Sequence, residues 1–113
     1  MAHQEQTAKL VDRLIELSGQ GKVSWQETAE ENTFLTSVGK FVVSIAKPEA
    51  FAFNLTISDQ AGRTLEETRD YVNDFYSSPD YTRVSKLHEL ARRRALNVDA
   101  ALKEMMYSLD QLH

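Results

Sequence analysis

The chain has 113 residues, a formal net charge of −4 and no cysteine. This length predicts a single domain, residues 1–113, with one hydrophobic core, and the lack of cysteine excludes disulfides and thiolate metal sites. No apolar run reaches the length that a bilayer requires, and the first residues do not resemble a signal peptide, so we expect a cytoplasmic protein that does not enter membranes. The acidic charge argues against a general nucleic-acid binder, because that affinity comes largely from neutralising phosphates.

The first predicted element is an amphipathic helix over residues 4–17, which Gly19 and Gly21 end. Its apolar positions recur at the spacing of one helical face: Ala8, Val11, Leu14 and Ile15. Over residues 22–28, Val23 and Trp25 stand two apart. This spacing predicts either a short strand or an extended arm that inserts the single tryptophan into the core.

Residues 41–57 are the expected centre of an antiparallel sheet. Large apolar side chains alternate with smaller or polar ones here, so they should all point to one face: Phe41, Val43, Ile45, Phe51, Phe53, Leu55 and Ile57. The segment Lys47-Pro48-Glu49 interrupts the alternation and predicts the connection of a hairpin. A strand over residues 33–38 should precede the hairpin, and an exposed edge strand over residues 63–69 should follow it.

Residues 70–78 mix aromatic and turn-forming side chains, and we expect a loop with one helical turn. Ser78-Pro79-Asp80 then predicts a helix over residues 79–96, with Ser78 as its cap and Pro79 at its first position. Its buried face should consist of Tyr81, Val84, Leu87, His88 and Ala91. A second helix should begin at Asn97, with a narrow apolar seam at intervals of three and four residues: Val98, Leu102, Met105, Leu109 and Leu112. The expected fold class is α+β: an N-terminal helix, an antiparallel meander of three to five strands and two C-terminal helices packed on one face.

No motif in the chain has the residues that catalysis or metal binding requires. Gly19-Gln20-Gly21-Lys22 lacks the first glycine and the final hydroxyl residue of a phosphate-binding loop, and it follows a helix rather than a strand. His88-Glu89 begins like the helical zinc motif, but Arg92 occupies the position of the second histidine. We therefore expect a protein that is not an enzyme and that has no cofactor, metal or catalytic residue.

Two features of the C-terminal half are candidates for partner binding. Arg92, Arg93 and Arg94 could clamp an acidic group, although cations at a helix C-terminus also offset the helix dipole. In the last helix, Met105, Met106, Leu109 and Leu112 provide an adaptable apolar surface that could form a homodimer or bind another protein. The expected function is a small non-catalytic protein-binding domain, an adaptor, regulator or inhibitor, of a kind common in bacteria and phages.

Two other functions stay open from the sequence. One is nucleic-acid binding by the basic helix over residues 79–96, which carries Arg83 and Lys86 besides the three consecutive arginines. The other is a small enzyme or ligand-binding protein with a pocket between the sheet and the helices.

Overall fold

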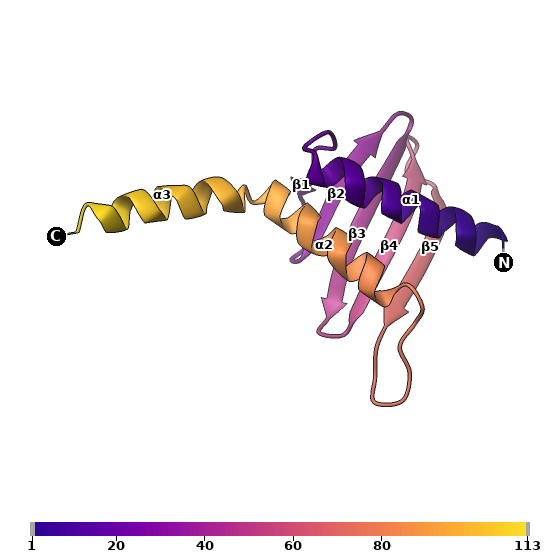
Figure 1. Ribbon diagram of the computed structural model, residues 1–113. Coiled ribbons are helices and arrows are strands. Elements are labelled where there is room, and N and C mark those ends of the chain that lie inside the picture. Colours follow the sequence, from indigo (N-terminus) through magenta and orange to yellow (C-terminus); the bar gives the residue numbers. More distant parts are fainter. Residues whose placement is uncertain (1, 113) are drawn as a thin grey trace.

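The computed structural model describes residues 2–112, which form three helices and five strands (Figure 1). In chain order the elements are α1 (Ala2–Gly19), β1 (Gln26–Glu27), β2 (Thr33–Val38), β3 (Phe41–Glu49), β4 (Ala52–Asp59), β5 (Thr64–Tyr71), α2 (Tyr81–Ala95) and α3 (Val98–Asp110). The predicted α+β class is confirmed, including the N-terminal helix, the antiparallel meander and the two C-terminal helices.

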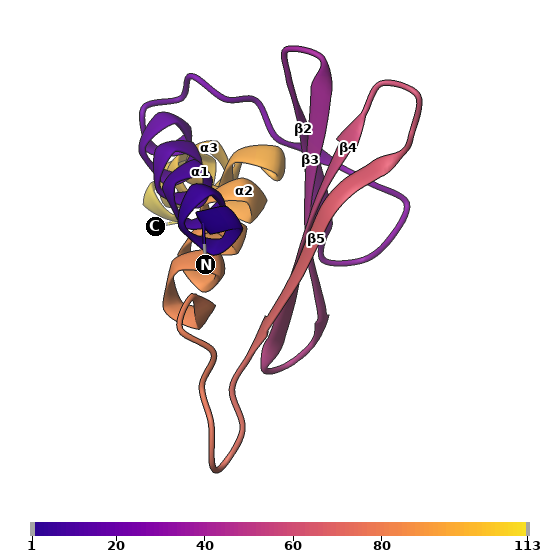
Figure 2. The same ribbon diagram turned by 90° about the vertical axis from the view of Figure 1, so that its right-hand side faces the viewer.

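The five strands pair in the order of the chain, β1-β2-β3-β4-β5, and each pair is antiparallel. In the centre of the sheet Thr36 lies opposite Val43, and Ile45 lies opposite Leu55. Directly opposite residues share a face of the sheet, so this register gathers the apolar side chains on one side. Both α1 and α2 cover that side, while the part of the chain that the structure describes places no helix on the other face of the sheet (Figure 2).

The core lies between this face and the two helices. The sheet contributes Val43, Ile45, Phe53 and Leu55, all at most 3% exposed. The helices contribute the buried side chains of Val11 and Leu14 from α1 and of Val84, Leu87 and Ala91 from α2. The hydrophobic periodicity therefore predicted the faces of both helices and of the central strands correctly.

Trp25 joins α1 to the sheet. Its side chain is 5% exposed, and its indole N–H donates a hydrogen bond of 2.8 Å to the hydroxyl of Ser18 in α1. The residues that follow form the short strand β1, which pairs with β2. Both interpretations of this segment are correct, because the arm that inserts Trp25 continues into a strand.

The predicted connection of the central hairpin is wrong. Lys47, Pro48 and Glu49 belong to β3, and the chain turns at Ala50 and Phe51 instead. The register shifts between Ala46 and Glu49, and this irregularity accommodates a proline that cannot donate a ladder hydrogen bond. As a consequence Phe51 lies in the turn and is 63% exposed.

Phe41 is 45% exposed at the opposite end of the hairpin. It is the first residue of β3 and pairs with Val38 and Asp59 at the ends of their strands, where the helices no longer cover the sheet. Of the seven apolar residues expected on one face, Val43, Ile45, Phe53 and Leu55 belong to the core. Phe41 and Phe51 are exposed, and Ile57 is only partly buried and lies outside the core cluster.

The segment before α2 also differs from the prediction. Asp70 and Tyr71 complete β5, and residues 72–77 form an extended loop closed by a bridge between Val72 and Ser77, without a helical turn. Ser78 does not cap α2, because its hydroxyl accepts a hydrogen bond from the N–H of Tyr71 at 2.8 Å. The helix begins at Tyr81, after Asp80 and beyond Pro79.

The second C-terminal helix, α3, extends past the edge of the sheet on the side of the helical layer (Figures 1 and 2). The radius of gyration is 15.9 Å, whereas about 13 Å is typical of a compact domain of this length. The longest dimension is accordingly 59 Å. The projecting helix α3 accounts for this elongation.

Candidate functional site

The exposed side chains of α3 form the largest apolar surface that the sequence predicted. Asn97 adopts a left-handed conformation with φ 54°, which separates α3 from the end of α2. No residue of α3 is buried. We define the α3 apolar surface by five exposed side chains: Leu102 (49%), Met105 (60%), Met106 (59%), Leu109 (53%) and Leu112 (76%). Tyr107 is also exposed, but the helical spacing places it on the opposite face of α3.

Most of this surface is one continuous seam. Positions 98, 102, 105, 109 and 112 are separated by four, three, four and three residues, which is the spacing of the two apolar positions of a heptad repeat. The residues beside the seam are Asp99, Ala101, Met106 and Ser108, which are small or apolar apart from Asp99. A second helix could therefore pack against the seam without meeting a row of charges.

The three consecutive arginines point to three different elements. Arg92 pairs with Glu89 in its own helix at 3.3 Å, Arg93 pairs with Asp99 of α3, and Arg94 donates a hydrogen bond of 2.9 Å to the carbonyl of Gly19 in α1. Successive helical residues are about 100° apart, so these groups fan around the end of α2. They remain on the surface, but the structure does not gather them on one spot.

The other arginine of α2 is also paired. The Nε atom of Arg83 lies 2.7 Å from Asp12 of α1, and its guanidinium also contacts Asp80. The hydrogen bond to Asp12 raises the pKa of Arg83 above its ordinary value. These pairs offset positive charge along α2, which weakens the attraction for phosphates that nucleic-acid binding would need.

His88 is a core residue rather than a ligand. It is 4% exposed, its Nε2 atom lies 2.9 Å from the carbonyl oxygen of Asn32, and its ring packs between those of Phe34 and Phe53 at 5.5 and 5.3 Å. Burial lowers the pKa of His88, which favours the neutral ring. Within residues 2–112, no three histidine, aspartate or glutamate side chains are grouped so that they could hold a metal.

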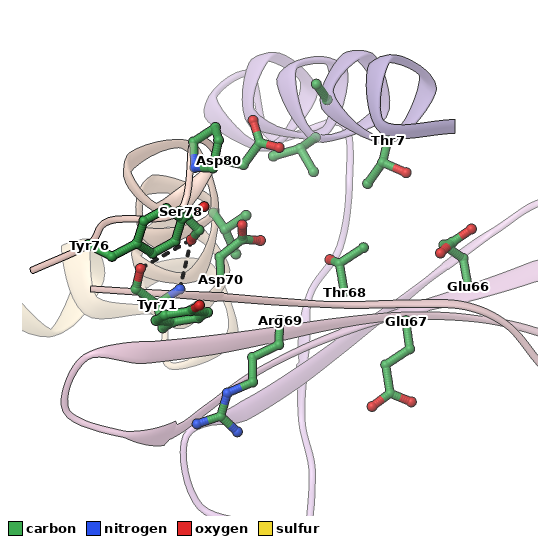
Figure 3. Close-up of a pocket in the computed structure, with 14 residues that line it drawn as sticks. Thr7, Glu66, Glu67, Thr68, Arg69, Asp70, Tyr71, Tyr76, Ser78 and Asp80 are labelled. Atoms are coloured by element: carbon green, nitrogen blue, oxygen red, sulfur yellow. Dashed lines mark hydrogen bonds between the residues drawn. The ribbon is translucent and has the colours of Figure 1, made fainter. Parts of the chain in front are cut away.

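The structure also contains a cavity of about 350 Å³ between β5, α1 and the start of α2. The sequence left open a pocket between the sheet and the helices but nominated no site residues for it. Figure 3 shows Glu66, Thr68 and Asp70 on the side of β5 that faces α1, and Glu67 and Arg69 on the other side. Apolar atoms of Ala8, Val11 and Val84 complete the walls. The alternation of residues 66, 68 and 70 could have indicated this shared face, but polar side chains do not predict burial.

Asp70 is the most buried acid of this cavity, at 8% exposure. Burial raises its pKa, and the nearby charge of Asp80 acts in the same direction, while a hydrogen bond from Ser78 opposes both. Thr68 lies two residues before Asp70 on the same face of β5, and its hydroxyl oxygen is buried without a hydrogen-bond partner. Such groups are costly to bury and are typical of places where a ligand completes the hydrogen bonding.

Comparisons of the chain with protein-family models, curated proteins and solved structures give no match. None of the helices in residues 2–112 is both long and apolar enough to cross a membrane. The fold and its surfaces thus define a class only: an α+β protein with two helices on one face of a five-stranded meander and a third helix that projects from it.

Proposed function

We propose that this protein works by binding other proteins, as an adaptor, regulator or inhibitor, and that α3 is its docking element. The observation that carries this proposal is the α3 apolar surface, on which five neighbouring large side chains are each about half exposed or more. Contiguous apolar side chains on a soluble protein mark interaction sites. Methionine is frequent on such surfaces because its flexible side chain adapts to the partner.

The first occupant of the seam is a second copy of the chain. The heptad spacing makes the seam self-complementary, and Ala101 and Ser108 beside it are small enough to allow close approach of two helices. A two-fold axis along the seam would bury the same side chains from both copies, which is the commonest arrangement of small homodimers. The paired α3 helices would then be parallel and would leave the two sheets side by side at one end of the dimer.

The three arginines are the proposed contact for a further partner with acidic side chains. Arg92 and Arg93 form ion pairs in which their own side chains are 41% and 37% exposed, so the guanidinium groups can exchange a local carboxylate for one on a partner. Guanidinium groups bind carboxylates with two parallel hydrogen bonds, which favours such an exchange.

Two double variants test the role of α3. The seam variant, Leu109→Glu with Leu112→Glu, places two charges on the seam. The outer-face variant, Ala100→Glu with Gln111→Glu, adds two charges on the far side of the same helix. Immobilised wild-type and variant chains are compared for the amounts of each host protein they retain, measured by mass spectrometry.

We expect the seam variant to lose the specific partners and the outer-face variant to keep them. Retention of the same proteins by all three chains would contradict docking through α3. The circular dichroism spectra of all three should match, since no side chain of α3 belongs to the core.

A further inference from the structure

We infer that β5 is a second binding site, which accepts an extended polypeptide segment and inserts a lysine or arginine side chain of that segment into the acidic cavity. This site is independent of the α3 apolar surface. It lies at the β5 edge of the sheet, whereas α3 leaves the fold on the side of β1 (Figure 1). The inference rests on the free edge of β5, on the cavity beside it and on the charges of both.

The hydrogen bonds near Tyr71 show which backbone groups of β5 face outward. The N–H of Val72 donates to the carbonyl of Phe51, on the side of β4. Tyr71 uses the opposite side, where its N–H bonds to the hydroxyl of Ser78 and its carbonyl accepts from the N–H of Ser78, both at 2.8 Å. In an antiparallel strand, alternate residues direct both backbone groups to the same side.

Glu67 and Arg69 follow the same alternation as Tyr71, so their N–H and C=O groups point away from β4. Residues 2–112 place no strand on that side, because β5 is the last strand of the sheet. These four groups form an open ladder to which an antiparallel segment can add, with two of its residues opposite Glu67 and Arg69.

The cavity determines which side chain such a segment must carry. The residue opposite Thr68 lies between the two ladder pairs, and its side chain points to the same face as that of Thr68, which is the cavity. There it meets the unpartnered hydroxyl of Thr68 and lies between the carboxylates of Glu66 and Asp70. A lysine or arginine side chain fits these walls, because its stem packs on apolar atoms of α1 and α2 while its charge reaches the acids.

Charge also argues against a second copy of β5 as the occupant. If two β5 strands paired antiparallel about Thr68, Glu66 of one copy would face Asp70 of the other on the cavity side. Like charges directly opposite each other destabilise a sheet. Glu67 would face Arg69 on the other side, but both side chains are exposed there, and exposed ion pairs contribute little. The acidic side chains thus protect the edge from pairing with itself and select a basic segment.

The experiment uses three labelled nine-residue peptides that alternate threonine and serine and differ only in the central residue, which is lysine, norleucine or glutamate. Binding to the full chain is measured by fluorescence anisotropy. We expect the lysine peptide to bind about tenfold or more tightly than the norleucine peptide, the difference typical of a charge-assisted hydrogen bond. The glutamate peptide should not bind.

Two pairs of variants separate the contributions of the edge and the cavity. Glu67→Pro removes an outward N–H and should abolish binding, while Glu67→Ala keeps that group and should bind the lysine peptide normally. Asp70→Asn should remove the preference for lysine over norleucine. Asp110→Asn, at the far end of α3, makes the same change in net charge and should keep the preference.

Amide hydrogen exchange of the wild-type chain gives a reading that does not depend on the folding of any variant. On adding the lysine peptide, the amides of Glu67 and Arg69 should exchange more slowly, because they become hydrogen-bonded. The amide of Thr68, which faces β4, should not change.

Any of three results would overturn the inference. The amides of Glu67 and Arg69 could exchange at unchanged rates, or the lysine peptide could fail to saturate the chain up to about 1 mM. The third is that Asp70→Asn prefers lysine over norleucine as strongly as the wild type does. The α3 seam variant should bind the peptide like the wild type. If the proposed dimer through α3 is wrong, the peptide test of β5 therefore still applies. If the peptide does not bind, the tests of α3 still apply.

Discussion

Phe53 is the residue at which the sheet and α2 meet. It is 3% exposed, and its ring lies 5.4 Å from that of Tyr81 and 5.3 Å from that of His88. Thr56 lies on the opposite face of β4 and is only partly buried.

We therefore predict that Phe53→Ala lowers the free energy of unfolding by about 3 to 5 kcal/mol, the range for truncating a buried phenylalanine. Thr56→Ala should cost about 1 kcal/mol or less, the span of strand propensities. Urea denaturation of both variants measures the difference, and equal losses would mean that the two faces of β4 are equally important to the core.

His88 should make the protein sensitive to mild acid. Its folded pKa lies below the ordinary value of 6.5, mainly because burial disfavours the charged ring, and Lys47 and Arg92 add to this effect while Glu89 and the bond to Asn32 oppose it. The unfolded chain therefore binds the proton more readily than the folded chain. Stability is lost as the pH falls from about 6.5 towards the lowered folded pKa.

The test compares urea denaturation of the wild type and His88→Gln at about pH 7.5 and about pH 5, on either side of the ordinary histidine pKa. The wild type should lose more stability between these two pH values than the variant, since glutamine does not titrate. Identical losses would assign the acid sensitivity to other groups.

Arginine side chains at the end of α2 link this helix to the other two. Arg93 contacts α3 and Arg94 contacts α1, but all these contacts lie at the surface. Exposed ion pairs contribute about 0 to 1 kcal/mol each. The fold should therefore tolerate their removal.

We predict that replacing Arg92, Arg93 and Arg94 together with alanine leaves a folded chain that no longer retains the acidic partner. Circular dichroism and thermal denaturation report the fold, and capture from the host reports the partner. A matched variant with lysine at the three positions keeps the charge and isolates the role of guanidinium geometry. If the alanine variant retains every protein that the wild type retains, the arginines serve only to offset the helix dipole.

At the scale of the whole molecule, α3 lengthens the protein without adding to its core. We predict that the wild type is a dimer at concentrations of tens of micromolar and that the seam variant, Leu109→Glu with Leu112→Glu, is a folded monomer. The physical reason is that two charges at the centre of a paired seam would be buried without partners. Light scattering measures the mass and circular dichroism the fold.

The outer-face variant, Ala100→Glu with Gln111→Glu, should remain dimeric. A wild type that is monomeric together with a seam variant that unfolds would show instead that these leucines stabilise the single chain.

Local patterns in the sequence determined the elements and the class of this protein. The β-branched and aromatic content of residues 33–38 predicted a strand with the bounds of β2. The three- and four-residue spacing in α1 and α2 identified their buried faces, because this period follows directly from the geometry of the helical backbone. The apolar seam of α3 was visible in the same way. Whether that seam would be covered was not, since periodicity is identical for a buried and an exposed amphipathic helix.

The tertiary structure decided the features that depend on neighbours distant in the chain. Pro48 reads as a break in the sequence, yet the register shift in β3 accommodates it, so the turn moved to Phe51 and exposed that side chain. Ser78 reads as a helix cap, yet its hydroxyl bonds to Tyr71 across the loop. The cavity at Asp70 exists only because α1, from the other end of the chain, lies across from β5, and no local pattern of polar residues records that arrangement.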